Sequence, residues 1–266
     1  MKFTKMHGLG NDYLYVYDTQ DPKDPGELSR QLSDRHFGAG SDGMIWILPS
    51  NVADFKMRIF NADGSEAMMC GNGIRCVGKY VYDKGYTRKT TLTIETLSGI
   101  KTLDLKVVNG KVSTVSVDMG KAKVCPSAML HLEQTEITYQ PVSMGNPHAV
   151  IFVEDASLAP LTTLGPRIEH HPRFQDGVNV EFVQVINEHT LRMRVWERGS
   201  GVTLACGTGA CASTAAAIAA GYCTFNQPIE VQLDGGSLLI TINDHWDVNM
   251  QGPATTIYEG EVNEDA

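Results

Sequence analysis

Alternation of hydrophobic and polar residues along most of the chain predicts a protein built mainly of short strands. In the first half, the alternation predicts strands within residues 2–17 and at residues 44–48, 56–60, 90–96, 101–107 and 112–118. In the second half, it predicts strands at residues 137–142, 148–153, 179–186, 190–196, 229–233, 237–242 and 246–250. Each half therefore supplies enough strands for a sheet of its own.

Helical periodicity is confined to a few short stretches. Asp24 and Pro25 open the first, as N-cap and first helical residue, and the stretch continues to about residue 37. The others are residues 73–83, a short stretch before Gly165-Pro166, and the alanine-rich residues 209–220. We therefore expect an α+β fold in which each half forms a curled, mainly antiparallel sheet around one central helix.

Two glycine-rich turns, each carrying a cysteine, occupy equivalent places in the two halves. Residues 70–73 are Cys-Gly-Asn-Gly, and residues 206–209, which follow 136 positions later, are Cys-Gly-Thr-Gly. The same offset pairs Arg58 with Arg194. We infer a diverged tandem duplication with two pseudo-symmetric domains. The expected domains are residues 1–118, with the C-terminal tail 256–266 packed on them, and residues 119–255.

The charge, the low-polarity stretches and the cysteines of the chain indicate which binding partners and which cellular compartment to expect. The 266-residue chain has a formal net charge of −9 and no basic run, which argues against nucleic acid or an anionic membrane as a partner. Its longest stretch of low polarity, residues 210–221, is too short to span a bilayer. No signal peptide precedes the six cysteines, so we expect a reduced, cytoplasmic setting rather than a disulfide framework.

Cys70 and Cys206 each stand where a strand pattern gives way to a helix pattern. A thiol at a helix N-terminus lies beside unsatisfied backbone N–H groups, which favour the thiolate and lower the thiol pKa. The glycines let backbone amides approach a carboxylate. One thiolate and one thiol on opposite faces of a Cα atom would invert an amino acid by acid–base catalysis, without a cofactor or a metal.

Other roles for the cysteines compete with this one. Cys70 with Cys76, and Cys206 with Cys211, could be zinc ligands, but neither spacing is a C-x-x-C knuckle. A redox-active dithiol is also disfavoured, because the sequence has no C-x-x-C motif. A non-catalytic protein that binds a metal through its thiols is nevertheless kept as an alternative from another functional class. Plain burial is the default for the remaining cysteines, which are Cys76, Cys125, Cys211 and Cys223.

The sequence resembles the diaminopimelate epimerase family, whose members are cofactor-independent two-cysteine epimerases, over nearly the whole chain. The residues that carry the resemblance are 5–12, 60–66, 70–73, 144–148, 178–182, 197–199 and 205–209. It implies two pseudo-symmetric domains with the active site in the cleft between them, and a homodimer. It further implies epimerisation of LL-2,6-diaminopimelate to the meso form, for lysine and peptidoglycan synthesis, with Cys70 and Cys206 as the acid–base pair.

The resemblance also assigns substrate contacts. Backbone amides of Gly71, Asn72, Gly207 and Thr208 would hold the reacting carboxylate. The distal end of the substrate would be bound by Asn11, Asn61, Asn146, Asn179, Glu197 and Arg198. An arginine suits a distal carboxylate and a glutamate suits a distal ammonium. The asparagines in turns have a simpler explanation in backbone geometry, and an isolated Glu-Arg pair is ordinarily a solvated strand end.

Two positions depart from the family pattern, and one related activity stays open. Gly43 replaces a glutamine that contacts the substrate in some members, and Thr208 replaces a serine. Related racemases of proline, hydroxyproline or histidine use the same two-cysteine chemistry. Arg198 argues against those substrates, because a buried guanidinium would then lack a carboxylate partner. His148 could tune a cysteine, but a histidine beside a strand is explained as well by a supporting or packing role, so it is kept outside the catalytic pair.

Overall fold

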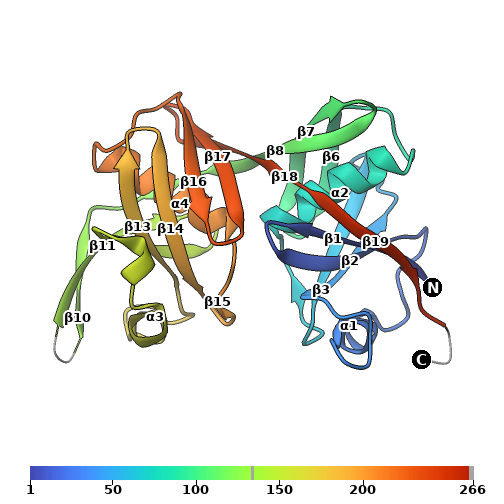
Figure 1. Ribbon diagram of the computed structural model, residues 1–266, viewed down its shortest axis with the longest axis horizontal. Coiled ribbons are helices and arrows are strands. Elements are labelled where there is room, and N and C mark those ends of the chain that lie inside the picture. The colour runs from blue at the N-terminus through green and yellow to red at the C-terminus, as the bar shows by residue number, and fades with distance from the viewer. Residues whose placement is uncertain (133–134, 264–266) are drawn as a thin grey trace. The chain divides into compact units, whose positions relative to one another are not determined.

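The structure, a computed structural model, describes residues 1–132 and 135–263. It divides into two compact units, each considered by itself (Figure 1). Unit 1 comprises Met1–Val117 and Gly252–Ala266, and unit 2 comprises Asp118–Gln251. The chain leaves unit 1 within β8 (Lys111–Lys121) and returns to it within β18 (Asp247–Pro253). Residues 264–266 of the predicted tail lie outside the described residues.

Unit 1 is a sheet whose strands run in the order β19, β1, β2, β3, β4, β6, β7, β8, with β5 paired to β4. The bounds are β1 (Lys2–Gly8), β2 (Asn11–Tyr17), β3 (Gly43–Leu48), β4 (Phe55–Asn61), β5 (Glu66–Ala67), β6 (Thr91–Thr96), β7 (Gly99–Val108) and β19 (Thr255–Glu261). The C-terminal strand β19 thus pairs with the N-terminal strand β1.

Unit 2 repeats this plan. Its strands run β10, β11, β12, β13, β14, β16, β17, β18, with β9 paired to β11 and β15 to β14. The bounds are β9 (Lys123–Val124), β10 (Ala128–Leu132), β11 (Thr135–Ser143), β12 (Pro147–Phe152), β13 (Asn179–Asn187), β14 (Thr190–Glu197), β15 (Gly201–Val202), β16 (Pro228–Leu233) and β17 (Gly236–Ile242). Parallel pairs occur at matching places, β2–β3 and β4–β6 in unit 1, and β12–β13 and β14–β16 in unit 2.

One helix in each unit lies against the concave side of the sheet. These are α2 (Gly71–Asp83) in unit 1 and α4 (Gly207–Ala219) in unit 2. Helix α4 contacts seven strands, β9, β11, β12, β13, β14, β16 and β17, and nearly all its residues are buried. Alanine makes this close enclosure possible because it has little side-chain volume. The predicted mixed fold, a curled sheet around a helix, is confirmed.

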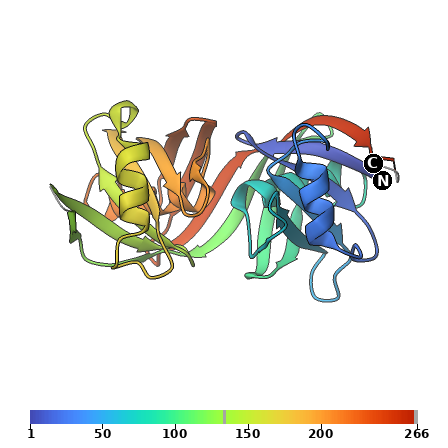
Figure 2. The same ribbon diagram turned by 90° about the horizontal axis from the view of Figure 1, so that it is seen from below.

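The other face of each sheet carries a second helix (Figure 2). Helix α1 (Pro25–Ser33) packs on β3 and β4, and α3 (Leu161–Glu169) packs on β13, β14 and β15. Strand β3 is consequently buried on both faces. Its residues Met44, Trp46 and Leu48 pack in one core cluster with Leu32 of α1, whereas Ile45 points toward α2.

Several predicted boundaries were wrong. Helices α2 and α4 begin at residues 71 and 207, two residues before the predicted starts, because the cysteines themselves are the N-caps. Helix α1 ends at Ser33, where the carboxylate of Asp34 accepts the N–H groups of the next turn. Helix α3 continues through Pro166, which removes only one backbone donor. The segment that follows the predicted domain boundary at residue 118 contains β9 and leads into β10, and β10 was not predicted.

No helix within residues 1–132 and 135–263 has both the length and the apolar character needed to cross a bilayer.

Candidate functional site

Each of the two predicted thiols caps a buried helix. Cys70 is the N-cap of α2 and Cys206 is the N-cap of α4, both with extended backbone conformations. The Gly73 N–H donates to Cys70 Sγ, and the Gly209 N–H donates to Cys206 Sγ, each at 3.3 Å. The prediction that each sulfur lies at a helix N-terminus is therefore confirmed. In both units, the first turn directs backbone N–H groups toward the side on which the thiol lies.

The third residue of each helix must be glycine because a strand passes directly beneath it. A Cβ atom on Gly73 would lie 2.6 Å from Ile45 Cδ1, and one on Gly209 would lie 2.9 Å from Glu181 Oε1. Both distances are shorter than any van der Waals contact. The second glycine of each Cys-Gly-x-Gly turn thus lets the thiol-bearing turn rest on the sheet.

In unit 1, the amide of Asn11 lies against the Cys70 thiol. Cys70 Sγ donates to Asn11 Oδ1 at 3.4 Å, while Asn11 Nδ2 donates to Asp42 Oδ2 at 2.9 Å. The same Asp42 oxygen accepts the backbone N–H of Asp12 at 3.0 Å. Asp42 therefore fixes which end of the Asn11 amide faces the sulfur. Sequence reasoning did not single out Asp42.

A buried arginine ties down the first turn of α2. Arg75 is 0% exposed. Its Nη1 donates to Gly71 O at 3.0 Å, Nη2 donates to Asn72 Oδ1 at 3.1 Å, and Nε donates to Pro253 O at 3.1 Å. The turn that carries the predicted carboxylate-binding amides is thus braced by a cation from within its own helix. The sequence offered only an arginine within a hydrophobic helix as a signal.

In unit 2, Cys206 has a different set of neighbours. Its Sγ lies 3.6 Å from Thr208 Oγ1, and Asn146 Nδ2 donates to that hydroxyl oxygen at 3.3 Å. The structure therefore brings together three residues that the sequence predicted for the site. Asn146 in turn contacts His148, whose Nε2 lies 3.1 Å from Asn146 Oδ1.

His148 is part of a buried pair that sequence reasoning missed. Its Nδ1 lies 2.6 Å from Glu181 Oε1, and both side chains are fully buried. For His148, a role in tuning a cysteine and a supporting or packing role were both left open, and Glu181 was not singled out. The available signal was a glutamate at the centre of the hydrophobic strand pattern of residues 179–186, where an apolar residue is expected.

Burial, not the helix terminus, dominates the electrostatics of Cys206. Burial raises the pKa of the Cys206 thiol well above its usual range, and the carboxylates of Glu197 and Glu181 add to the effect. The N–H of Gly209 and the hydroxyl of Thr208 act in the opposite direction and are outweighed. The prediction of a lowered pKa is therefore wrong for Cys206. Burial destabilises the thiolate more than the hydrogen bond from one N–H group stabilises it.

Glu197 lies at the end of β14 with its carboxylate turned toward the Cys206 turn. Thr203 Oγ1 donates to Glu197 Oε1. Burial raises the pKa of Glu197, while hydrogen bonds from Thr203 and Cys206 partly lower it. Sequence reasoning found the glutamate but not Thr203, its hydroxyl partner.

Asn179 and Arg198 are hydrogen-bonded to each other, but through the backbone of Arg198 and not through its guanidinium group. Asn179 Oδ1 accepts the backbone N–H of Arg198 at 3.0 Å, and Asn179 Nδ2 donates to Pro147 O at 3.1 Å. The Arg198 side chain is exposed and donates from Nη1 to Asp176 O at 3.1 Å. The expectation of a buried guanidinium is therefore wrong. The remaining candidate, Asn61, is half-buried at the end of β4 and donates to Ser65 Oγ at 3.0 Å.

None of the six cysteines forms a disulfide bond. Within the part of the chain that the structure describes, no group of three or more His, Cys, Asp or Glu side chains is arranged to hold a metal ion.

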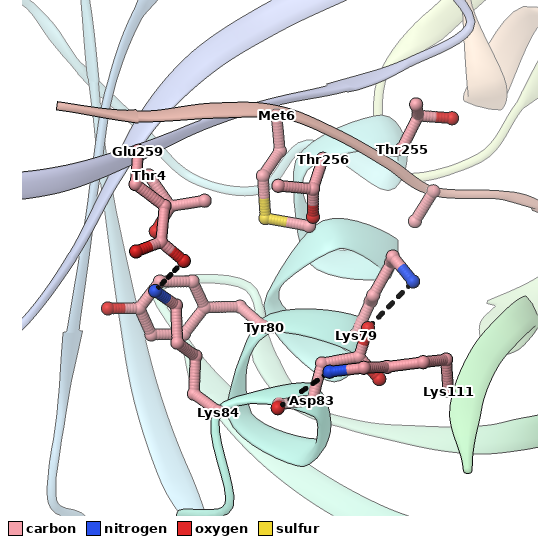
Figure 3. Close-up of a pocket in the computed structure, with 11 residues that line it drawn as sticks. Thr4, Met6, Lys79, Tyr80, Asp83, Lys84, Lys111, Thr255, Thr256 and Glu259 are labelled. Atoms are coloured by element: carbon pink, nitrogen blue, oxygen red, sulfur yellow. Dashed lines mark hydrogen bonds and ion pairs between the residues drawn. The ribbon is translucent and has the colours of Figure 1, made fainter.

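Unit 1 also contains a cavity of about 440 Å³ beside α2, β1 and β19 (Figure 3). Its charged groups pair with one another: Lys79 Nζ lies 2.7 Å from Asp83 Oδ2, and Lys84 Nζ lies 2.5 Å from Glu259 Oε1. None of the predicted site residues lines it. We assign it no part in the chemistry of the thiols.

Comparison with known proteins identifies relatives along the full length. The family model described as diaminopimelate epimerase matches residues 3–125 and 141–257. A diaminopimelate epimerase of Methanococcus maripaludis is 54% identical, with coverage of 98% of this chain and 99% of the relative. One from Bacillus subtilis is 50% identical, with 97% of each chain covered.

Solved structures share the fold at low sequence identity. A probable proline racemase from Agrobacterium radiobacter matches with a TM-score of 0.77 at 18% identity, covering 99% of this chain and 93% of that one. A hydroxyproline epimerase from Agrobacterium vitis matches equally well, with a TM-score of 0.77, 18% identity, and coverage of 98% and 90%. At this identity the match bears on the fold alone.

Proposed function

The chain belongs to the diaminopimelate epimerase family, and on that premise we propose that Cys70 and Cys206 are the two groups that exchange the Cα proton of diaminopimelate. The enzyme is an isomerase of amino acids that interconverts the LL and meso forms. The observation that carries the proposed assignment is the matched pair of thiols, each the N-cap of a buried helix and each accepting the N–H of the third helical residue at 3.3 Å.

Proton bookkeeping explains why two sulfurs are needed. The thiolate of one cysteine takes the Cα proton, leaving an electron pair delocalised into the adjacent carboxylate. The thiol of the other cysteine then gives its proton to the opposite face of the same carbon. The two sulfurs have exchanged protonation states, and the reverse reaction restores them. One sulfur alone would return the proton to the face from which it came.

Stabilisation of the negative charge falls to the helix N-termini. The first N–H groups of an α-helix have no acceptor within the helix, and the helix dipole adds positive potential there. We propose that backbone N–H groups of Gly71 and Asn72, with those of Gly207 and Thr208, hold the reacting carboxylate. Such preorganised donors strengthen as charge develops on the oxygens. The Arg75 hydrogen bonds to Gly71 O and Asn72 Oδ1 support this role in unit 1.

The distal end of the substrate is proposed to contact the side chains that the family resemblance assigned, which are Asn11, Asn61, Asn146, Asn179, Glu197 and Arg198. The half-buried carboxylate of Glu197 suits the distal ammonium. The exposed guanidinium of Arg198 is the natural partner of the distal carboxylate, because arginine binds carboxylates with two parallel hydrogen bonds. Proline lacks both distal groups, so this pair favours diaminopimelate over the cyclic amino acids.

The substrate assignment is tested by incubating the enzyme in D₂O with LL-diaminopimelate, L-proline or trans-4-hydroxy-L-proline under reducing conditions. Chiral chromatography with mass spectrometry follows both inversion and deuterium at Cα. We expect deuterated meso-diaminopimelate and no inversion of the cyclic amino acids. Inversion of proline without inversion of diaminopimelate would overturn the assignment while leaving the two-thiol chemistry in place.

We also propose that the enzyme acts in the cytoplasm as a homodimer. Six cysteines without a disulfide bond suit a reducing compartment. Light scattering coupled to size exclusion should give twice the chain mass of 29.0 kDa. A mass of one chain at micromolar concentration would reject the dimer.

A further inference from the structure

Glu181 is a buried carboxylate in the middle of β13 and has no role in the chemistry described above. Its side chain is fully buried. Oε1 contacts His148 Nδ1 at 2.6 Å, whereas Oε2 has no hydrogen-bond partner among the residues described. A buried carboxyl oxygen without a hydrogen-bond partner destabilises the folded state, because it has given up its hydrogen bonds to water. Stability alone therefore does not account for a glutamate at this position.

A continuous chain of polar contacts leads from this carboxyl group to the Cys206 thiol. Glu181 contacts His148, and His148 Nε2 lies 3.1 Å from Asn146 Oδ1. The other end of the amide, Asn146 Nδ2, donates to Thr208 Oγ1 at 3.3 Å, and that hydroxyl lies 3.6 Å from Cys206 Sγ. Each group in the chain is thus oriented by the one before it.

The direction of the Asn146 amide sets the hydrogen-bonding role of the imidazole. Because Asn146 Nδ2 donates to Thr208, its Oδ1 faces His148 and accepts a hydrogen bond from Nε2. Nδ1, on the other side of the ring, then faces Glu181 Oε1. Without a partner at Nδ1, nothing would hold the imidazole in the form that donates from Nε2.

Unit 1 shows that the fold does not require a carboxylate at this position. Ile45, in β3, lies beneath Gly73 of α2 just as Glu181, in β13, lies beneath Gly209 of α4. The two residues are separated by the same 136 positions as the two cysteines. An apolar side chain fills this place under Cys70, and a carboxyl group fills it under Cys206. A carboxyl group directly beneath the thiol-bearing turn is therefore a feature of unit 2, and Cys70 is supported differently, by Asn11 and Asp42.

We propose that Glu181 is a positioning residue for proton transfer at Cys206, acting through His148 and Asn146 on the Thr208 hydroxyl. The inference rests on the proposed two-thiol reaction. It assigns to unit 2 a support built on a buried His–Glu pair, whereas in unit 1 the Asn11 amide that contacts Cys70 is held by Asp42. Removing the acceptor at Nδ1 should release the amide and misorient the hydroxyl beside the reacting sulfur.

The test replaces Glu181 by its counterpart from unit 1, in Glu181→Ile, and by a neutral hydrogen-bonding residue, in Glu181→Gln. The glutamine amide can donate to Nδ1 and keep Nε2 as donor, so this variant should retain kcat within about threefold. Glu181→Ile should lower kcat on the order of 100-fold, with KM changed less than about threefold, because small misplacements of reacting groups have effects of that size. Should Glu181→Ile fail to fold, Glu181→Met enters the same assay.

A second readout separates positioning from a structural defect. In D₂O, the ratio of deuterium in recovered substrate to deuterium in product reports how often the carbanion is reprotonated on its original face. If Cys206 transfers its proton slowly in Glu181→Ile, this ratio should rise at least about threefold when the reaction starts from one isomer. It should not rise when the reaction starts from the other. A general loss of packing would change both directions alike.

Glu136→Ile is the matched control, since Glu136 forms an exposed pair with His131 at 2.9 Å in the same unit. It should leave kcat and both deuterium ratios unchanged. Unaltered kcat in Glu181→Ile, or equal changes in both directions, would overturn the inference while wild-type exchange still supported the proposed function. Absence of exchange in the wild type would remove the proposed function and the inference with it.

Discussion

The Gly209 N–H donates to Cys206 Sγ at 3.3 Å, and Gly209 itself lies directly above Glu181. The equivalent glycine of unit 1, Gly73, lies above Ile45. The two thiol-bearing turns are therefore alike in backbone geometry and unlike in what supports them. This difference leads to the first prediction.

Alanine at Gly209 should be more damaging than alanine at Gly73. The new Cβ at residue 209 would lie 2.9 Å from Glu181 Oε1, which is held by His148, whereas at residue 73 it would meet the mobile end of the Ile45 side chain. Overpacking of this kind costs about 1–3 kcal/mol. We expect the larger loss of unfolding free energy and of kcat in Gly209→Ala, measured by urea denaturation and steady-state kinetics. Equal losses in the two variants would contradict this account of the turns.

Asp42→Ala should impair catalysis through Asn11. Without Asp42 Oδ2, the Asn11 amide is no longer fixed with its oxygen toward Cys70 Sγ. We expect kcat to fall on the order of tenfold. Arg35→Ala is the control, because the largely exposed Arg35 side chain pairs with Oδ1 of Asp42 and with Asp12, and not with the Asp42 Oδ2 atom that holds Asn11. Exposed pairs contribute little, so this control should change kcat less than about threefold.

Arg198→Ala should weaken binding of diaminopimelate more than it slows the chemical step. The exposed guanidinium has a backbone carbonyl as partner and is available to a substrate carboxylate. Loss of one charged hydrogen-bonding partner costs about 1.5–3 kcal/mol, so KM should rise at least about tenfold with kcat nearly unchanged. Arg194→Ala, which removes another arginine that is paired with Asp234, should leave KM unchanged. An unaltered KM in Arg198→Ala would count against the distal carboxylate.

Stability should fall at alkaline pH partly because of Cys76. Burial raises the pKa of the Cys76 thiol to about 11, whereas the unfolded chain releases this proton near pH 8.5. Between these values the folded state binds more protons, so the stabilisation present below about pH 8.5 is lost as the pH rises toward 11. Cys76→Ala should have a shallower decline of unfolding free energy, by up to about 1.4 kcal/mol per pH unit. Parallel curves for the two proteins would contradict the raised pKa.

Local signals in the sequence were sufficient to predict most of the fold. The Asp24-Pro25 pair marks the start of α1 because the carboxylate cap and the fixed φ angle of proline are local properties, which do not depend on the rest of the fold. The starts of α2 and α4 were predicted two residues too late, because cysteine has no strong preference for the N-cap position and so does not mark a helix start. Strand β10 was missed, since its pattern is short and half-exposed.

The candidate site was predictable only where its residues lie in recognisable turns. Cys70 and Cys206 were found from the repeated Cys-Gly-x-Gly. The side chains that support them were not, because Asp42 and Glu181 are brought to the thiols by distant strands. Sequence periodicity also cannot show that burial outweighs the helix terminus in setting the pKa of Cys206. The assigned substrate contacts stay predictions until variants are measured.

The most direct test of the two-thiol reaction is isotope exchange by the single variants Cys70→Ala and Cys206→Ala in D₂O, starting from LL- and from meso-diaminopimelate. Each variant keeps at most one acid–base sulfur. We predict that neither epimerises either isomer at a measurable rate, while any remaining exchange at Cα returns deuterium to the starting isomer only. Epimerisation at the wild-type rate in either variant would contradict the account.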